Sequence, residues 1–393
     1  MPVDASVSAD ELGTRFLLFP QAPSLSGYGE PERVWVSPPA GTIGPGPSDD
    51  RMYVVDPIEK PDHYEYPYMP PFHGAANPPV EPGPSGHFDH LEPASRAFAC
   101  AHLYGSLCRV LDIWESYLGR RIEWFFKDGY ERLELVPMLD WHNAQSGYGY
   151  MEFGFMRTEA GDMVPHALNF DVIAHEMGHT IMFSEMGVPA PEGRNSQFHG
   201  FHEACADLTA LISALHFDSV SDRLLRGTHG NLYTLNEINR IAEISDHKQI
   251  RIAGNSRTMS EVTDEVHDLS RPFTGAVFDI LVDIYLDQLR ERGLIDDPVA
   301  LAAHGVEAGE GVADRIQAAF DEAYRTRHFA FKSALFSARD LVGRRLAHVW
   351  TVLSPDDLSY ADAATAFLDA DRKLGQGRYE RAIVESFAWR EII

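Results

Sequence analysis

Residues 170–182, FDVIAHEMGHTIM, constrain this chain more than any other stretch. Their apolar side chains recur at helical spacing, and only Gly178 weakens the pattern. On such a helix His175 and His179 stand one turn apart on one face, separated by about 6 Å of rise. Two imidazoles so placed can bind one Zn²⁺, and Glu176 beside them can take a proton from a zinc-bound water. The stretch therefore predicts a helix with two metal ligands and a general base.

The H-E-x-x-H pattern alone leaves a second interpretation open. A chain with 18 histidines can carry the pattern by chance, on an amphipathic helix whose histidines are solvated or packed in the core. A catalytic zinc needs a third protein ligand and an open position for water. The choice between the two interpretations therefore depends on whether the downstream sequence supplies a third ligand.

The downstream sequence GFHEACADLTALI offers such a ligand. Glu203 and Asp207 are four residues apart on a predicted helix, so both carboxylates share one face. Glu203 can complete a His₂Glu site with His175 and His179. Asp207 can accept the second ring N–H of a ligating histidine, which fixes the tautomer of that ring. An ordinary helix with two acidic surface residues is the alternative, because acidic residues are common in this chain.

The charge of the chain limits its partners. Lys+Arg 33 against Asp+Glu 59 gives a net charge of −26, which repels nucleic acid and anionic membranes, so we expect neither as a partner. The N-terminal residues show no basic segment followed by an apolar core, and no run of about 18 apolar residues could span a membrane. Three cysteines without a C-x-x-C motif are typical of a reducing compartment. We therefore expect a cytoplasmic protein.

Two regions of different composition predict an α+β fold with two lobes. Residues 1–93 hold 18 of the 25 prolines, which limits strands there to short or edge ones. Beyond the H-E-x-x-H helix the pattern is mostly helical. We predict a β-rich N-terminal lobe, residues 1–168, with one long helix, and a mainly helical C-terminal lobe, residues 169–393, that begins with the zinc-motif helix. Helices are predicted at residues 93–118, 170–182, 201–215, 273–289, 312–324, 337–353, 359–374 and 377–387, and strands at 15–19, 33–36, 51–55, 122–126 and 133–138.

Taken in order, the motifs resemble those of the thermolysin-like gluzincin metallopeptidases. H-E-x-x-H followed by E-x-x-x-D is that family's pattern, and DVIAHE is close to the family's form of the first motif. Asn143 and Ala144 resemble the Asn-Ala of the family's edge strand, which hydrogen-bonds the substrate backbone. Val266 and His267, followed by Ser270, are similar to V-H-x-x-S, whose histidine steadies the tetrahedral intermediate. The resemblance covers most of the chain from about residue 50 onward.

The resemblance implies a thermolysin-like two-lobed fold and a zinc metalloendopeptidase with one Zn²⁺ per chain. The implied partner is a peptide or protein substrate. Zinc would polarise the scissile carbonyl of that substrate and lower the pKa of a zinc-bound water. Glu176 would act as general base on that water and then pass the proton to the leaving amine. His267 would donate a hydrogen bond to the developing oxyanion, and Asp264 or Glu265 would orient it.

The sequence departs from the family pattern in two places. Between the zinc helix and the third ligand no tyrosine supplies a second oxyanion donor, and Arg194, His199 or His202 could replace it. Asp171 matches one calcium ligand of the family, but Ala214 stands where another acidic ligand is expected. Calcium binding is therefore doubtful.

The sequence leaves two other functions open. Residues 149–152, GYME, resemble the G-x-M-E-N strand of gluzincin aminopeptidases, whose glutamate binds a free N-terminus. Phe153 in place of the asparagine, and the V-H-x-x-S segment, favour the endopeptidase. The second alternative is a catalytically idle zinc-binding scaffold, against which the intact ligand set argues.

Overall fold

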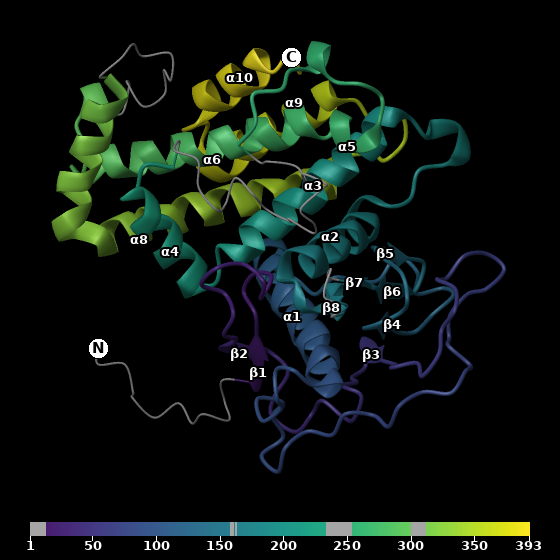
Figure 1. Cartoon of the computed structure of the whole chain (residues 1–393). Helices are drawn as coiled ribbons and strands as arrows, with labels where there is room; N and C mark the ends of the chain where they lie inside the picture. Colours follow the sequence, from purple (N-terminus) through teal and green to yellow (C-terminus); the bar gives the residue numbers. More distant parts are fainter. Residues whose placement is uncertain (1–12, 158–160, 162, 233–253, 300–311) are drawn as a thin grey trace. The chain divides into compact units, whose positions relative to one another are not determined.

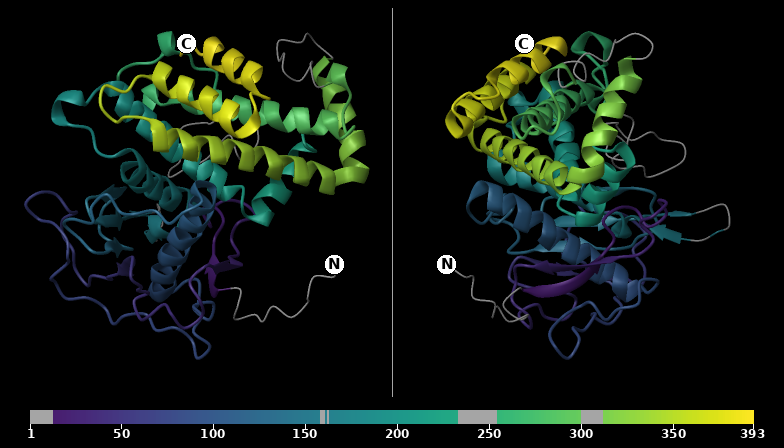
Figure 2. Two further views of the ribbon diagram at one scale, coloured as in Figure 1. Left: turned by 180° about the vertical axis from the view of Figure 1, so that it is seen from behind. Right: turned by 90° about the vertical axis from the view of Figure 1, so that its left-hand side faces the viewer.

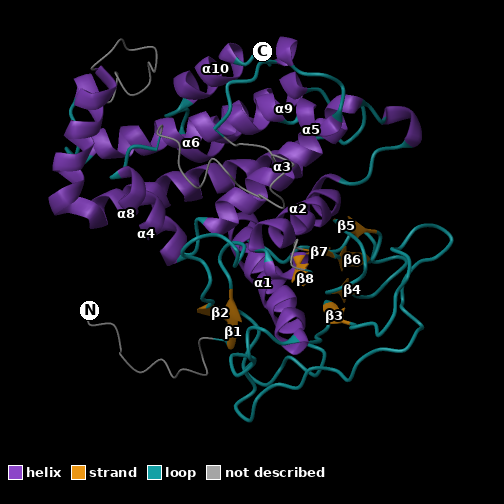
Figure 3. Ribbon diagram, in the orientation of Figure 1, coloured by secondary structure: helices purple, strands orange, loops and turns teal. Residues whose placement is uncertain are grey.

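The computed structural model describes residues 13–157, 161, 163–232, 254–299 and 312–393. The chain divides into two compact units, Met1–Ser184 and Glu185–Ile393. Strands, drawn in orange in Figure 3, lie in the first unit, and the described part of the second unit is helical. This mixture is compatible with the predicted α+β fold, and the predicted lobe boundary after residue 168 stays a prediction. No described helix combines the length and apolar character needed to cross a membrane.

The strands of the first unit are short, as the density of prolines predicts. Antiparallel pairs β1–β2 and β7–β8 accompany a mixed four-stranded sheet with the order β3-β4-β6-β5. In that sheet β3, β4 and β6 are parallel, and β5 is an antiparallel edge strand. The described strands are β1 (Thr14–Leu18), β2 (Glu32–Val36), β3 (Met52–Val54), β4 (Leu133–Val136), β5 (Ala144–Gly147), β6 (Tyr150–Phe153), β7 (Phe155–Arg157) and β8 (Met163–Pro165).

Helix α1 (Arg96–Leu118) is the long helix of the first unit, and it contacts β1, β2 and β3 (Figure 1). The Ser95 side chain accepts the N–H of Phe98 and caps the N-terminus of the helix. Gly119 ends it with a φ of 70°, the left-handed conformation that favours glycine at this position. The helix predicted at residues 93–118 is therefore confirmed.

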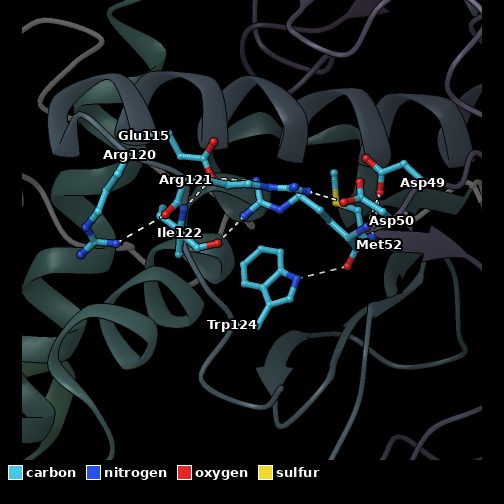
Figure 4. Close-up of polar contacts among 9 residues, drawn as sticks. Asp49, Asp50, Met52, Glu115, Arg120, Arg121, Ile122 and Trp124 are labelled. Carbon is cyan, nitrogen blue, oxygen red and sulfur yellow. Dashed lines mark hydrogen bonds and ion pairs between the residues drawn. The ribbon is translucent and has the colours of Figure 1, made fainter. Parts of the chain in front are cut away.

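The prediction of a strand at residues 122–126 is wrong, because side chains take the backbone groups that a β-ladder would use. The N–H of Ile122 donates to Oε1 of Glu115 at 2.8 Å, and its carbonyl accepts from the Arg51 guanidinium at 2.8 Å. The Trp124 indole donates to the Arg51 carbonyl at 3.2 Å, and the guanidinium lies 4.6 Å from the Trp124 ring centroid (Figure 4). The apolar side chains of Ile122, Trp124 and Phe126 are thus buried, although the segment forms an irregular stretch and a turn and not a strand.

The helices of the second unit pack around α6, which contacts α3, α5, α8 and α10. Figure 2 shows the yellow helix α9 beside the yellow-green α8, and α9 also contacts α10. The two helices predicted at residues 312–324 and 337–353 are one long element, interrupted at Arg327, where φ is −131° and ψ is 24°. The prediction missed α4. The described α-helices after α1 are α2 (Phe170–Met186), α3 (Ser196–Ala214), α4 (Asp218–Thr228), α5 (Val266–Leu269), α6 (Arg271–Glu291), α8 (Val312–Val352), α9 (Tyr360–Gly375) and α10 (Glu380–Trp389).

Candidate metal centre

Helix α2 carries the H-E-x-x-H residues as predicted. The helix starts where the Asn169 side chain accepts the N–H of Asp171 at 3.1 Å. One turn separates His175 from His179, and their Nε2 atoms lie 3.1 Å apart with the ring planes nearly perpendicular. His175 and Glu176 are each less than a tenth exposed. The first unit therefore holds two imidazole nitrogens and a carboxylate on one buried helix.

The donor set fits zinc. Two nitrogens bound to one tetrahedral Zn²⁺ lie roughly 3.3 Å apart, because each Zn–N bond is about 2.05 Å long. The 3.1 Å between the Nε2 atoms of His175 and His179 is close to that value. Each of these histidines offers one ring nitrogen to a metal ion, and the role of Glu203 as third ligand stays a prediction. A His₂Glu set favours zinc over magnesium or calcium, which take oxygen ligands.

In the second unit, Glu203 on α3 lies next to His267 on α5. The Asn195 side chain accepts the N–H of Phe198 at 2.7 Å and starts α3, two turns before Glu203. Nδ1 of His267 lies 3.3 Å from Oε2 of Glu203, with the His267 side chain about half exposed. The predicted third ligand and the predicted oxyanion donor are thus neighbours.

The residues after Thr263 hold His267 through its backbone. Ser270 donates its hydroxyl to the His267 carbonyl at 2.8 Å. The Glu265 carboxylate accepts the N–H of Asp268 at 2.8 Å and caps α5. Asp264 is exposed, and its predicted role in orienting the His267 ring stays a prediction. The spacing V-H-x-x-S therefore describes a helical turn in which the serine fixes the histidine's main chain.

The other predicted residues of the second unit differ in burial. Arg194 and His199 are exposed, and Nε of Arg194 is 3.5 Å from the Pro189 carbonyl oxygen. His202 is buried, with its ring 5.4 Å from that of Phe198. The choice of a second oxyanion donor among the three stays open.

Asp207 is also buried on α3. Its predicted hydrogen bond to a ligating histidine stays a prediction.

Strand β5, which holds the predicted substrate-binding residue Ala144, is an edge strand of the sheet. The N–H of Gly154 donates to the carbonyl of Asn143 at 2.9 Å, so this carbonyl points into the sheet. Because hydrogen-bonded pairs alternate along antiparallel strands, the N–H and C=O groups of Ala144 and Ser146 point to the outer edge. Within the described residues no backbone hydrogen bond joins that edge. The exposed Asn143 side chain lies at the start of β5.

Glu152, which the aminopeptidase hypothesis needs for a substrate's N-terminus, is fully buried on β6. Its Oε1 lies 2.6 Å from the Lys60 ammonium, and neither side chain is exposed. An internal ammonium already occupies the place of a substrate's amino group, which argues against the aminopeptidase. Sequence reasoning missed Lys60, because a lone lysine in a proline-rich segment carries no pattern.

Asp171, the predicted calcium ligand, is buried and accepts a hydrogen bond from the Gln21 amide at 2.9 Å. Ala214 is buried at the C-terminal end of α3 and offers no oxygen ligand from its side chain. A calcium site at these two residues would need other oxygen donors.

Comparison with known proteins adds a distant structural likeness. No protein-family model and no curated protein matches the chain. Solved structures do match, among them the precursor of protealysin, a metalloproteinase from Serratia proteamaculans. That match has 12% sequence identity and a TM-score of 0.44, and it covers 87% of each chain. A likeness of this degree gives no evidence on activity.

Proposed function

We propose that this chain is a zinc-dependent metallopeptidase that hydrolyses internal peptide bonds. The proposal rests on the Nε2 atoms of His175 and His179, 3.1 Å apart on α2, with the Glu176 carboxylate on the same buried helix. Glu203 is the third ligand, and Asp207 supports a ligating histidine. The close approach of two imidazole nitrogens supports a shared metal, because their separation of 3.1 Å is close to that of two nitrogens bound to one tetrahedral zinc.

The chain's own residues have three roles in the reaction. Zinc, when bound by this set, supplies the polarisation of the scissile carbonyl and the acidification of water. Glu176 removes a proton from the attacking water and passes it to the leaving amine. His267 donates a hydrogen bond to the carbonyl oxygen as negative charge develops, a contact whose removal costs about 3 kcal/mol in comparable sites.

The substrate is an extended peptide that pairs with β5. The outward backbone groups of Ala144 and Ser146 can each donate and accept a hydrogen bond, so the peptide adds one strand to the sheet. The Asn143 side chain adds donors and an acceptor at one end. Main-chain pairing requires no free terminus, which supports an endopeptidase.

Glu176→Gln tests the general base. The variant keeps the size of the side chain but cannot accept the proton, so we expect it to bind zinc at the wild-type level and to hydrolyse a quenched-fluorescence peptide library at least about a thousandfold more slowly. Glu185→Gln, on the same helix, is the matched control and should hydrolyse peptides at the wild-type rate. Activity retained in Glu176→Gln would contradict the mechanism.

Blocking the substrate's N-terminus separates the two peptidase hypotheses. An endopeptidase cleaves an N-acetylated peptide at the rate of the unblocked one, whereas an aminopeptidase loses its rate. A protein that binds zinc and cleaves nothing in the library would indicate the idle scaffold.

A further inference from the structure

Lys60 and Glu152 form an ion pair that is shielded from solvent in the first unit. The two charged groups are 2.6 Å apart, and neither side chain is exposed. The Lys60 ammonium also lies 3.7 Å from the Tyr64 ring centroid and 4.5 Å from that of Tyr68, and it donates to the carbonyl of Asp62 at 2.8 Å. Two aromatic faces, a carboxylate and a carbonyl thus replace the water around the ammonium.

The second oxygen of Glu152 joins this pair to the edge strand. Oε2 accepts the Tyr64 N–H at 2.7 Å and the Gln145 side-chain amide at 2.8 Å. The same amide donates to the Tyr64 carbonyl at 3.1 Å. Gln145 is the residue of β5 directly opposite Glu152, so its side chain lies on the same face of the sheet. A chain of contacts therefore runs from Lys60 through Glu152 to Gln145, in the central part of β5.

Lys60 and Tyr64 lie in a loop between β3 and α1, and Glu134, on β4, binds this loop at a second point. Its carboxylate accepts from the Tyr53 hydroxyl at 2.7 Å, the Tyr64 hydroxyl at 2.5 Å and the Phe72 N–H at 2.9 Å. Burial and the Glu134 carboxylate raise the pKa of Tyr64, so this hydroxyl stays protonated and donates at neutral pH. Lys60, Tyr64 and Phe72 belong to a described segment without a helix or a named strand, and the two carboxylates fix it on the sheet.

Stability alone does not explain such a pair. Apolar side chains of similar volume often stabilise a protein as well as a buried ion pair does, because both charges lose their hydration. The distinguishing feature is the direction of the bonds, which run from Lys60 through Glu152 to Gln145. Strand β5 has four residues and a hydrogen-bonded neighbour on one side, β6, so its conformation depends on such support. An edge held in its bound conformation loses less entropy when a peptide pairs with it.

We propose that Lys60, Glu152 and Gln145 are positioning residues that hold β5 in the conformation in which its outer edge pairs with an extended peptide substrate. This inference rests on the proposed function. The three residues touch no substrate, and they act through the backbone of Ala144 and Ser146.

Gln145→Ala is the most direct test, because it removes the link to β5 and leaves the ion pair intact. With an N-acetylated peptide we expect KM to rise roughly tenfold, the effect of one hydrogen bond to a charged group, and kcat to change less than about twofold. Peptide affinity in the Glu176→Gln background should fall by the same factor as KM rises. Tyr53→Phe is the control, since it removes a hydrogen bond to Glu134 on the side of β3 and should leave KM unchanged.

Amide hydrogen exchange supplies a readout that is independent of catalysis. In Gln145→Ala the amides of residues 144–147 should exchange faster, while those of β3 and β4 keep their wild-type rates. Lys60→Met with Glu152→Gln removes both charges together, which avoids an unpaired buried charge, and should raise KM in the same direction.

The outcomes separate this inference from the proposed function. An active wild-type protein whose KM and β5 exchange rates are unchanged by Gln145→Ala would overturn the positioning role alone. A zinc-loaded wild-type protein that hydrolyses no peptide would overturn the proposed function and this inference with it.

Discussion

The two units differ in which groups form hydrogen bonds with their backbone N–H and C=O groups. In the second unit the helices satisfy their own backbone, and apolar contacts along α6 hold them together. In the first unit short strands leave many backbone groups to side chains, such as Arg51 at Ile122 and Glu152 at Tyr64. Buried ion pairs occur in both units, but Arg345 and Asp371 join two helices, α8 and α9. The difference shows that a proline-rich region can be ordered when charged side chains take the place of a β-ladder.

The apolar core of the second unit should respond most strongly to truncation. The fully buried Phe273 ring lies 5.1 Å from Phe201, 5.5 Å from Phe387 and 5.7 Å from Tyr360. We expect Phe273→Ala to lower the free energy of unfolding by about 4 kcal/mol in chemical denaturation. Phe329→Ala, at an exposed position on α8, is the control and should change nothing measurable. Equal losses in both variants would contradict the assignment of the core.

The first unit should lose stability in acid through His102. This buried ring accepts the Phe19 N–H at Nε2 and donates from Nδ1 to the Ala167 carbonyl, both at 2.9 Å, so it is neutral. Burial lowers the pKa of His102 from 6.5 to about 4. The unfolded chain therefore binds a proton at a pH where the folded chain does not, and stability falls as the pH drops from about 6.5 to about 4, by roughly 3 kcal/mol in total.

Denaturation of wild-type protein and His102→Gln at several pH values measures this effect. The variant's stability should depend less on pH within that window. An identical pH dependence would show that His102 does not cause it.

The loss of one side-chain hydrogen bond to Glu134 should lower the stability of the protein moderately. Tyr64→Phe removes one of three hydrogen bonds to the buried Glu134 carboxylate, and we expect the free energy of unfolding to fall by about 2 kcal/mol. Tyr66→Phe, two residues on and exposed, is the matched control. If both variants unfold at the wild-type denaturant concentration, the hydrogen bond from Tyr64 to Glu134 does not stabilise the segment between β3 and α1.

Surface charge in the first unit should matter least. Lys127 and Glu123 form a 2.6 Å ion pair with both side chains largely exposed. Because solvent screens such a pair, Glu123→Gln should leave the unfolding transition unchanged within error. A clear shift would mean that exposed pairs, too, hold this unit together.

Local patterns in the sequence predicted the described α-helices other than α4 and α5, and strands β1 to β4. Apolar periodicity and a glycine C-cap are properties of neighbouring residues, so α1 and α2 were predictable. Residues 122–126 look like a strand because most of them are apolar, but Arg51, 71 residues before Ile122, and Glu115, on the preceding helix, take the backbone groups of Ile122. Hydrogen bonds between a backbone segment and side chains elsewhere in the chain leave no mark in the local sequence pattern.

The same distinction applies to the candidate site. His175, Glu176 and His179 are one helical turn, so the sequence alone reveals their common face. Lys60 and Gln145 are brought to Glu152 by a loop and an edge strand, and nothing local marks them. We expect positioning residues to be harder to predict than metal ligands for this reason.

The metal content of the purified protein shows whether His175 and His179 bind zinc. We expect one zinc per chain in the wild-type protein, loss of that zinc in His179→Ala, and retention in His199→Ala, where the substituted histidine is exposed on α3. Wild-type protein without zinc after incubation with the metal, or His179→Ala with its zinc intact, would contradict the proposed metal centre.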